Sequence, residues 1–151
     1  MPSVLFICTA NICRSPMAMG LFRSKVGDDP EWRIESAGTW SFKGQPAASY
    51  TRAVLALRGM DISDHRSRSL DRDLLYQFNL ILTMEDGHKE AISIEFPEIA
   101  NRVYLISEMV DEIYNIHDPI GGTIDEFELT AQEFDGIFDR GFNKIEALAR
   151  D

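Results

Sequence analysis

The sequence has few cysteines, no long apolar run and one long stretch without positive charge. Its two cysteines, Cys8 and Cys13, are too few for the disulfide framework of a small secreted domain and offer too few ligands for a zinc site. No uninterrupted apolar run approaches the roughly 20 residues that span a bilayer, and residues 1–8 lack the basic start of a signal peptide. We therefore expect a cytoplasmic protein without membrane insertion.

Positive charge is scarce, since 15 basic and 25 acidic residues give a formal net charge of −10. Phosphate contacts supply most nucleic-acid affinity, so this balance predicts no nucleic-acid binding. Residues 103–139 contain no lysine or arginine, whereas residues 1–68 have a small basic excess. That asymmetry could steer an anionic ligand toward one edge of the protein. A solvated acidic surface around a long loop explains most of these charges equally well.

The remaining pattern alternates strands and helices within a length typical of one domain, residues 1–151. Apolar runs rich in β-branched and aromatic residues predict strands at 3–7, 32–36, 80–84 and 103–105. Helical patterns lie between and after them, at 16–22, 47–58, 71–76, 85–94 and 130–148. Such alternation predicts an α/β protein with a parallel sheet covered by helices on both faces.

The last helix and the segment before it have their own signals. Thr130 and Glu133 form a capping-box pattern, which predicts that the helix begins at Thr130. Residues 107–129 would then be a long acidic loop, and long loops without secondary structure are often functional.

A candidate site follows the first strand, because ligands of such sheets bind at the carboxyl ends of the strands. The segment from Cys8 to Pro16 runs from that strand into a helix. Backbone N–H groups of such a loop, together with the helix N-terminus, can bind a tetrahedral oxyanion and favour the thiolate form of Cys8. The guanidinium of Arg14 can grip two oxygens of a phosphoryl group, and Ser15 can donate a hydrogen bond to the sulfur. A buried structural Cys8 with a surface Arg14 is the alternative.

At these residues the chain resembles the low-molecular-weight protein tyrosine phosphatases. Residues 8–16 look like the family's phosphate loop, and the segments 36–39, 59–68, 83–84 and 118–119 match in the same order, so the resemblance covers essentially the whole chain. It implies a three-layer, flavodoxin-like, doubly wound fold with a four-stranded parallel sheet. It further implies a phosphorylated protein substrate, phosphate or another oxyanion in the loop, a phosphocysteine intermediate and no metal or other cofactor. We expect a monomer or a weak dimer.

The resemblance also assigns roles to residues. Cys8 resembles the nucleophile, Arg14 the phosphate clamp and Asp118 the general acid, and a carboxylic acid on a loop beside the site suits that last role. The residues expected to form the substrate-binding loop are Thr9, Ala10, Asn11, Ile12, Cys13 and Ser15. Four residues resemble the hydrogen-bond network that holds this loop, namely Asn11, Ser15, Ser36 and His65. We expect the remaining histidines, His88 and His117, at the surface.

Three departures from the family bear on the substrate. Ala10 replaces a usual glycine and would be strained if the position required a positive φ. Residues 120–122, Ile-Gly-Gly, replace the aromatic residues that usually follow the Asp-Pro pair, which resembles the bacterial protein-arginine phosphatases. Ile12, by contrast, resembles the tyrosine-specific members, because the arginine phosphatases carry threonine there.

Two aromatic residues favour phosphotyrosine. Trp40 and Phe42 lie on a segment expected to flank the pocket, where either could stack on a substrate ring or simply pack on the base of the loop. We therefore expect a phosphotyrosine phosphatase that also accepts small aryl phosphates, with a protein-arginine phosphatase as the alternative.

Other activities fit the residues less well. An arsenate reductase shares the fold and first loop but needs further cysteines, and a non-catalytic phosphate-binding module needs neither Cys8 nor Asp118. Cys13 raises a redox hypothesis, which the resemblance supports: oxidation could pair it with Cys8 and switch activity off reversibly. Alternatively, Cys13 packs under the loop as a small apolar residue.

Overall fold

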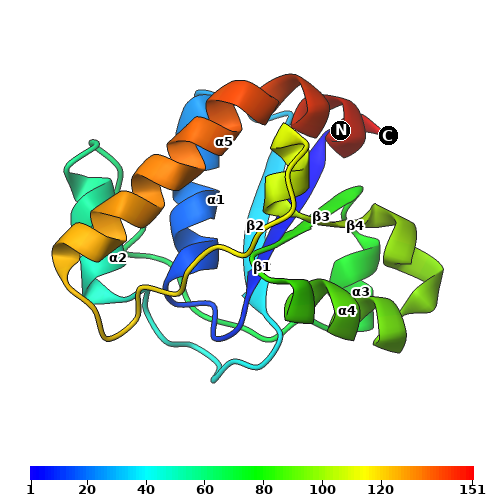
Figure 1. Cartoon of the computed structure of the whole chain (residues 1–151), viewed down its shortest axis with the longest axis horizontal. Helices are drawn as coiled ribbons and strands as arrows, with labels where there is room; N and C mark the ends of the chain where they lie inside the picture. Colours follow the sequence, from blue (N-terminus) through cyan, green and yellow to red (C-terminus); the bar gives the residue numbers. More distant parts are fainter.

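The computed structural model describes residues 1–151, and a parallel sheet of four strands forms its centre (Figure 1). The strands are β1 (Ser3–Cys8), β2 (Arg33–Gly38), β3 (Leu80–Thr83) and β4 (Val103–Leu105). Their order across the sheet is β2-β1-β3-β4. β1 therefore lies inside the sheet, and its last residue, Cys8, pairs with Gly38 at the carboxyl edge.

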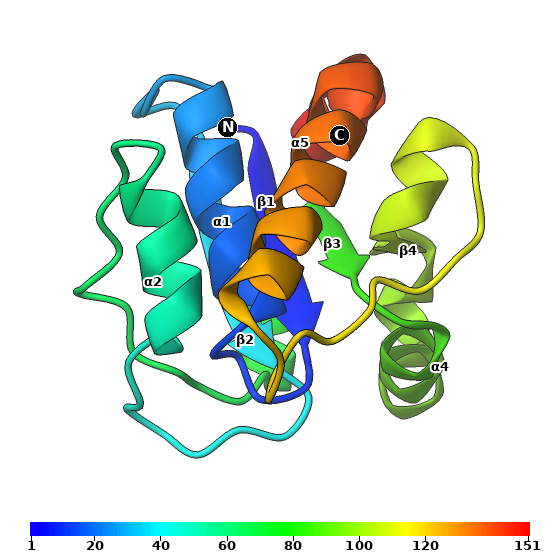
Figure 2. The same ribbon diagram turned by 60° about the vertical axis from the view of Figure 1, so that its left-hand side comes forward.

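Helices cover both faces of the sheet, which confirms the predicted doubly wound α/β fold (Figure 2). On one face lie α1 (Arg14–Lys25) and α5 (Ile124–Arg150), with α2 (Ser49–Ala56) packed beside them. On the other face lie α3 (Arg72–Tyr76) and α4 (Asp86–Glu95). Two 3-10 turns, η1 (Pro97–Arg102) and η2 (Ile106–Val110), flank β4. No helix combines the length and apolar character needed to cross a membrane.

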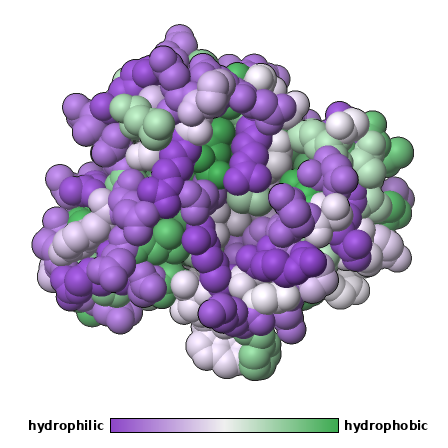
Figure 3. Space-filling view, turned by 180° about the vertical axis from the view of Figure 1, so that it is seen from behind, coloured by the Kyte–Doolittle hydropathy of each residue, from purple (hydrophilic) through white to green (hydrophobic).

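Side chains of β1 alternate between two apolar cores. Val4 and Phe6 point into the core under α1 and α5, whereas Leu5 and Ile7 point into the core under α3 and α4. Burial on both faces explains why β1 reads as a continuous apolar run. The face of the molecule seen in Figure 3 is largely hydrophilic, and hydrophobic residues are visible mainly in its hollows and at its edges.

The last helix begins earlier than the sequence predicted. Thr123 is its N-cap and accepts a hydrogen bond from the Glu126 backbone N–H at 3.3 Å. Thr130 lies inside the helix, where its hydroxyl donates to the Glu126 carbonyl at 3.1 Å. The predicted start at Thr130 was wrong because residues 123–126, Thr-Ile-Asp-Glu, carry the same capping pattern. The loop before α5 therefore spans only 111–123.

Candidate active site

The candidate site is built on the loop of residues 9–13, which joins β1 to α1. Within it Asn11 is buried and left-handed, with φ of 60°, a conformation that asparagine tolerates better than most residues. Ala10 has no positive φ, so the strain considered for this replacement of glycine does not arise.

Gly38 allows this loop to lie against the end of β2. A Cβ at Gly38 would lie 2.3 Å from the Thr9 carbonyl oxygen, a distance that no side chain can accept. The Thr39 backbone N–H donates to the Cys8 carbonyl at 2.9 Å, and the Trp40 N–H donates to the Thr9 carbonyl at 3.0 Å. This close approach of the loop explains why the third residue of the Ser-Ala-Gly-Thr segment is a glycine.

Asn11 connects the loop to its surroundings through four hydrogen bonds. Its Nδ2 donates to the hydroxyls of Ser15 (2.8 Å) and Ser36 (3.0 Å), and its Oδ1 accepts from the Arg68 backbone N–H at 3.1 Å. Its carbonyl lies 2.9 Å from His65 Nε2, which must therefore be the protonated nitrogen. Burial lowers the pKa of His65, so the imidazole is neutral near pH 7. The structure thus brings together the four residues of the expected network.

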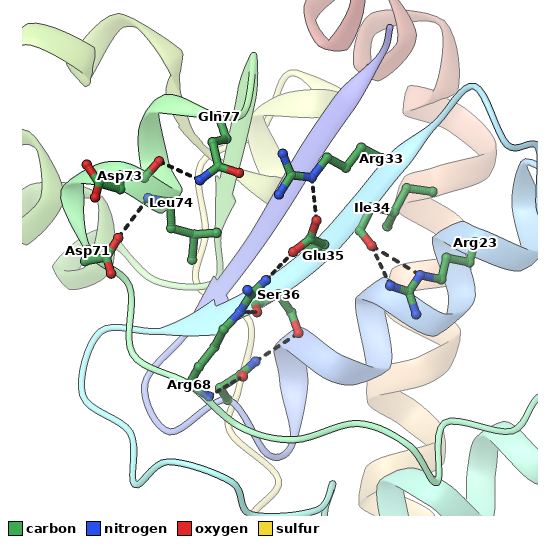
Figure 4. A network of polar contacts seen from close by, with 11 residues as sticks. Arg23, Arg33, Ile34, Glu35, Ser36, Arg68, Asp71, Asp73, Leu74 and Gln77 are labelled. Carbon is green, nitrogen blue, oxygen red and sulfur yellow. Dashed lines mark hydrogen bonds and ion pairs between the residues drawn. The ribbon is translucent and has the colours of Figure 1, made fainter.

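Arg68 also anchors this network to the outer edge of β2 (Figure 4). Its Nε donates to the Ser36 carbonyl at 3.2 Å, and its Nη2 pairs with Glu35 Oε1 at 2.5 Å. Further along β2, Arg23 Nη2 donates to the Ile34 carbonyl at 2.6 Å. These side chains line a groove of about 590 Å³ that contains His65 and Ser36 but neither Cys8 nor Arg14.

The sulfur of Cys8 is hydrogen-bonded to the hydroxyl of Ser15. The two atoms, Sγ and Oγ, lie 3.0 Å apart. Ser15 Oγ accepts from Asn11, so its single proton can go either to the Cys8 sulfur at 3.0 Å or to the Ala37 carbonyl at 3.5 Å. The sulfur lies at the carboxyl end of β1, beside the N-terminus of α1, with the Ser15 hydroxyl within hydrogen-bond distance.

The guanidinium of Arg14 binds the protein through one nitrogen and leaves its other donors free. The side chain is buried, and Nη1 donates to Glu85 Oε2 at 2.6 Å and to the Ile116 carbonyl at 2.8 Å. Neither Nε nor Nη2 has a hydrogen-bond partner in the protein, and Nη2 lies 3.6 Å from Asp118 Oδ2. One edge of the guanidinium is thus fixed while the other keeps donors for a ligand.

Asp118 reaches Arg14 because its loop is attached to the end of β3. The Ile116 N–H donates to the Met84 carbonyl at 2.8 Å, and Asp118 follows two residues later. The carboxylate is 40% exposed, and its Oδ1 accepts from the Ile120 backbone N–H at 3.1 Å. The carboxyl group of Asp118 therefore lies beside the Arg14 guanidinium and is partly exposed to solvent.

Cys13 lies below the loop, within the apolar core under α1. Burial, and then the negative charge of Asp118, raise the pKa of its thiol to about 12. Cys13 is therefore a neutral thiol near pH 7, unlike a sulfur poised for nucleophilic attack. Both cysteines are free in this structure.

Trp40 and Phe42 stand beside the loop and are exposed to solvent. Their side chains are 67% and 62% exposed, and their rings contact each other edge to face with centroids 5.1 Å apart. Ser41, between them, donates its hydroxyl to the Ala10 carbonyl at 2.7 Å, which fixes the segment against the loop. Both rings are therefore largely open to solvent, and neither belongs to an apolar core.

His88 and Glu85 are the residues that sequence reasoning missed. The prediction of a surface His88 was wrong, because this side chain is buried and its Nε2 lies 2.9 Å from Thr9 Oγ1. Their position directly after β3 is a usable signal, since the carboxyl ends of parallel strands share one edge of the sheet. His117 is exposed, as expected.

Comparisons with known proteins agree with this geometry. The family model described as "Low molecular weight phosphotyrosine protein phosphatase" matches residues 3–149. A protein-arginine-phosphatase of Geobacillus stearothermophilus is 32% identical over 144 residues, 95% of each chain. A probable low molecular weight protein-tyrosine-phosphatase, EpsP of Ralstonia nicotianae, is 34% identical over 146 residues, 97% of each chain.

Two solved structures show the same likeness in three dimensions. The YwlE arginine phosphatase from Geobacillus stearothermophilus has a TM-score of 0.90 and 31% identity, over 97% of this chain and 94% of that one. The low molecular weight protein tyrosine phosphatase from T. tengcongensis has a TM-score of 0.90 and 38% identity, over 95% and 99%. Fold and relatives together define a protein phosphatase with a doubly wound α/β sheet. Within that class, the chain belongs to the low molecular weight phosphotyrosine protein phosphatase family.

Proposed function

We propose that this protein hydrolyses phosphotyrosine in protein substrates, and small aryl phosphates, through a phosphocysteine intermediate on Cys8. The observation that carries the proposal is the arrangement of three groups at one loop. The Cys8 sulfur lies 3.0 Å from the Ser15 hydroxyl, and the unbonded edge of Arg14 lies 3.6 Å from the Asp118 carboxylate. A nucleophile, a phosphoryl clamp and an acid are the groups that phosphate-ester cleavage needs.

In the first step the Cys8 thiolate attacks phosphorus. An S–P bond forms, the bond from phosphorus to the ester oxygen breaks, and Asp118 gives its proton to the departing phenoxide. Arg14 binds the equatorial oxygens through Nε and Nη2, which supplies positive charge where negative charge accumulates. Backbone N–H groups of the loop and the N-terminus of α1 add to this stabilisation.

In the second step water hydrolyses the phosphocysteine. Asp118, now a carboxylate, takes a proton from the attacking water while the S–P bond breaks and inorganic phosphate forms. The sulfur leaves as a thiolate, which the Ser15 hydroxyl stabilises at 3.0 Å. Two chemically simple steps thereby replace one direct attack by water.

The preference for phosphotyrosine is supported by the Trp40–Phe42 pair. Both rings are exposed, and Ser41 between them is bonded to the Ala10 carbonyl, so the pair can contact a phenyl ring whose phosphate occupies the loop. Ile12 adds a half-buried apolar group on the loop itself.

A protein-arginine phosphatase is the second candidate. Residues 120–122 place Ile-Gly-Gly, and no aromatic residue, after Asp118-Pro119. The arginine phosphatase of Geobacillus stearothermophilus is among the similar proteins both by sequence and by structure. A slot without an aromatic wall on the Asp118 side suits a guanidinium as well as a phenyl ring.

Rates on matched phosphotyrosine and phosphoarginine peptides, measured without added metal ion, test the proposal. We expect faster hydrolysis of the phosphotyrosine peptide, and no turnover of either by Cys8→Ser. Trp40→Ala and Phe42→Ala should raise KM for the phosphotyrosine peptide, whereas Ile94→Ala removes an equally exposed apolar group from α4 as the control. Faster hydrolysis of phosphoarginine would favour the second candidate. Cytoplasmic location and a monomeric or weakly dimeric state stay predictions from the sequence.

A further inference from the structure

We infer that the Thr9 hydroxyl is a substrate-contacting donor of the phosphate loop and that His88 is the residue that orients it. The inference deepens the proposed function, because it names two further groups at the same site. Thr9 Oγ1 and His88 Nε2 lie 2.9 Å apart, although 79 residues separate them in the sequence. Thr9 is exposed at the loop, whereas His88 is buried at the start of α4.

The protonation of the imidazole follows from its two contacts. The backbone N–H of Glu85 donates to His88 Nδ1 at 3.2 Å, so Nδ1 presents a lone pair. In a neutral imidazole the proton then resides on Nε2, which donates it to Thr9 Oγ1. Burial and the nearby charge of Arg14 lower the pKa of His88, more than Glu85 and Asp118 raise it. The neutral tautomer is therefore the form present near pH 7.

This donation determines what the Thr9 hydroxyl does. A hydroxyl that accepts from His88 keeps its own proton for another acceptor. His88 is the only hydrogen-bond partner of the Thr9 side chain within the protein. An oxygen of a phosphoryl group bound in the loop is the acceptor that the site supplies. A chain of hydrogen bonds, here called the relay, thus runs from the Glu85 N–H through His88 to the Thr9 hydroxyl and on to the bound oxyanion.

The contact between His88 Nε2 and the Thr9 hydroxyl is not needed to cap α4. At the start of α4, His88 uses only its Nδ1, which accepts from the Glu85 backbone N–H. Glu85 also holds Arg14 Nη1 at 2.6 Å, so one helix start positions both the guanidinium and the Thr9 hydroxyl. A residue with an acceptor alone could cap the helix but could not orient Thr9.

Three substitutions separate the relay from a structural role. Thr9→Val removes the hydroxyl at nearly constant shape. His88→Asn keeps an acceptor in the place of Nδ1 but has nothing in the place of Nε2, whereas His88→Gln restores an amide donor there. The probe is tungstate, a tetrahedral oxyanion, with binding measured by calorimetry. The kcat and KM for p-nitrophenyl phosphate, and the melting temperature, are recorded for each variant.

We expect Thr9→Val to weaken tungstate binding about tenfold, as one lost hydrogen bond to a charged group implies. His88→Asn should weaken it to a similar extent, His88→Gln should recover part of the loss, and Thr9→Val/His88→Asn should be no worse than Thr9→Val. Unchanged tungstate binding in Thr9→Val overturns the donor role of Thr9. If His88→Asn weakens binding as much in the Thr9→Val variant as it does in the wild-type protein, His88 does not act through Thr9 and the relay is overturned. A wild-type protein that binds tungstate without hydrolysing esters would contradict the proposed function while leaving this test intact.

Discussion

The guanidinium of Arg14 forms an ion pair with the carboxylate of Glu85, with Nη1 and Oε2 2.6 Å apart. The arginine side chain is 2% exposed, whereas that of Glu85 is 37% exposed. A single nitrogen of Arg14 makes this pair and the bond to the Ile116 carbonyl. The pair therefore fixes the rotation of the guanidinium plane while leaving Nε and Nη2 to a ligand.

Glu85→Gln should impair catalysis by loosening that orientation. The amide retains a hydrogen-bond acceptor but loses the charge, so we expect kcat/KM for p-nitrophenyl phosphate to fall about tenfold. Inorganic phosphate should inhibit the variant more weakly. Asp86→Asn is the matched control, because Asp86 is an exposed neighbour whose side chain does not contact Arg14. Equal effects of the two substitutions would show that the loss of one negative charge near the site, and not the loss of the contact with Arg14, lowers the rate.

Asp118→Asn should slow substrates according to their leaving groups. A poor leaving group needs the proton that Asp118 supplies, so its rate should fall about 10²-fold or more. p-Nitrophenolate leaves without a proton, so the first step with p-nitrophenyl phosphate should change much less. Single-turnover rates over a series of substituted phenyl phosphates measure this as a steeper dependence on leaving-group basicity. An unchanged slope would remove Asp118 from the acid role.

Much of this site could be predicted because its first part is contiguous in sequence. Cys8, Arg14 and Ser15 lie on one strand–loop–helix unit, where local geometry determines which groups meet. The hydrogen-bond partners of the Arg14 guanidinium are Glu85 and the Ile116 carbonyl, which are 71 and 102 residues away in the sequence. No local pattern encodes that meeting, because it depends on the crossover to β3 and on where the later loop attaches.

His88 and Thr130 show two further limits. At His88 the cap reverses the common pattern, with an acidic N-cap and a histidine at the third helical position, so no familiar signature indicated burial. At α5 two Thr-x-x-Glu patterns compete, and both fit a helix start. Packing decides in favour of the earlier one, since the buried Phe127 extends the apolar stripe of α5 toward its N-terminus.

Cys13 should resist alkylation under conditions that modify Cys8. Its thiol is buried and its pKa is about 12, so almost no thiolate forms near pH 7. Mass spectrometry of peptides after iodoacetate treatment should find the label on Cys8, and inorganic phosphate should protect that residue. The two cysteines are about equally buried, so labelling of Cys13 at a comparable rate would contradict the raised pKa of its thiol.

Peroxide tests the redox hypothesis for the same pair. Oxidation of Cys8 to a sulfenic acid would allow the Cys13 thiol to displace water and form a disulfide. We predict an inactive Cys8–Cys13 species that a thiol reductant returns to full activity. Irreversible oxidation of Cys8 without any such bond would support a purely structural Cys13.

Stability should fall as pH drops below about 6.5, the ordinary pKa of histidine. Burial lowers the pKa values of His65 and His88, so the unfolded chain binds more protons than the folded protein in this range. The stability from keeping both rings neutral is complete above that pH and is lost as pH falls toward the folded-state values. Urea unfolding at pH 7.5 and 5.5 should show the loss, and His88→Asn should reduce it. An identical pH dependence in that variant would remove His88 from the account.

Two glycine substitutions should have opposite effects on stability. Gly38→Ala would place a Cβ 2.3 Å from the Thr9 carbonyl oxygen, a backbone clash that should cost about 1–3 kcal/mol and displace the loop that holds Cys8. Gly136→Ala is the matched control, because Gly136 lies inside α5 with nothing within 4 Å of the added atom. Alanine should stabilise that helix by about 1 kcal/mol. Thermal unfolding and phosphate inhibition measure both effects, and a Gly38→Ala protein with normal stability and phosphate affinity would show that the loop does not depend on this close approach.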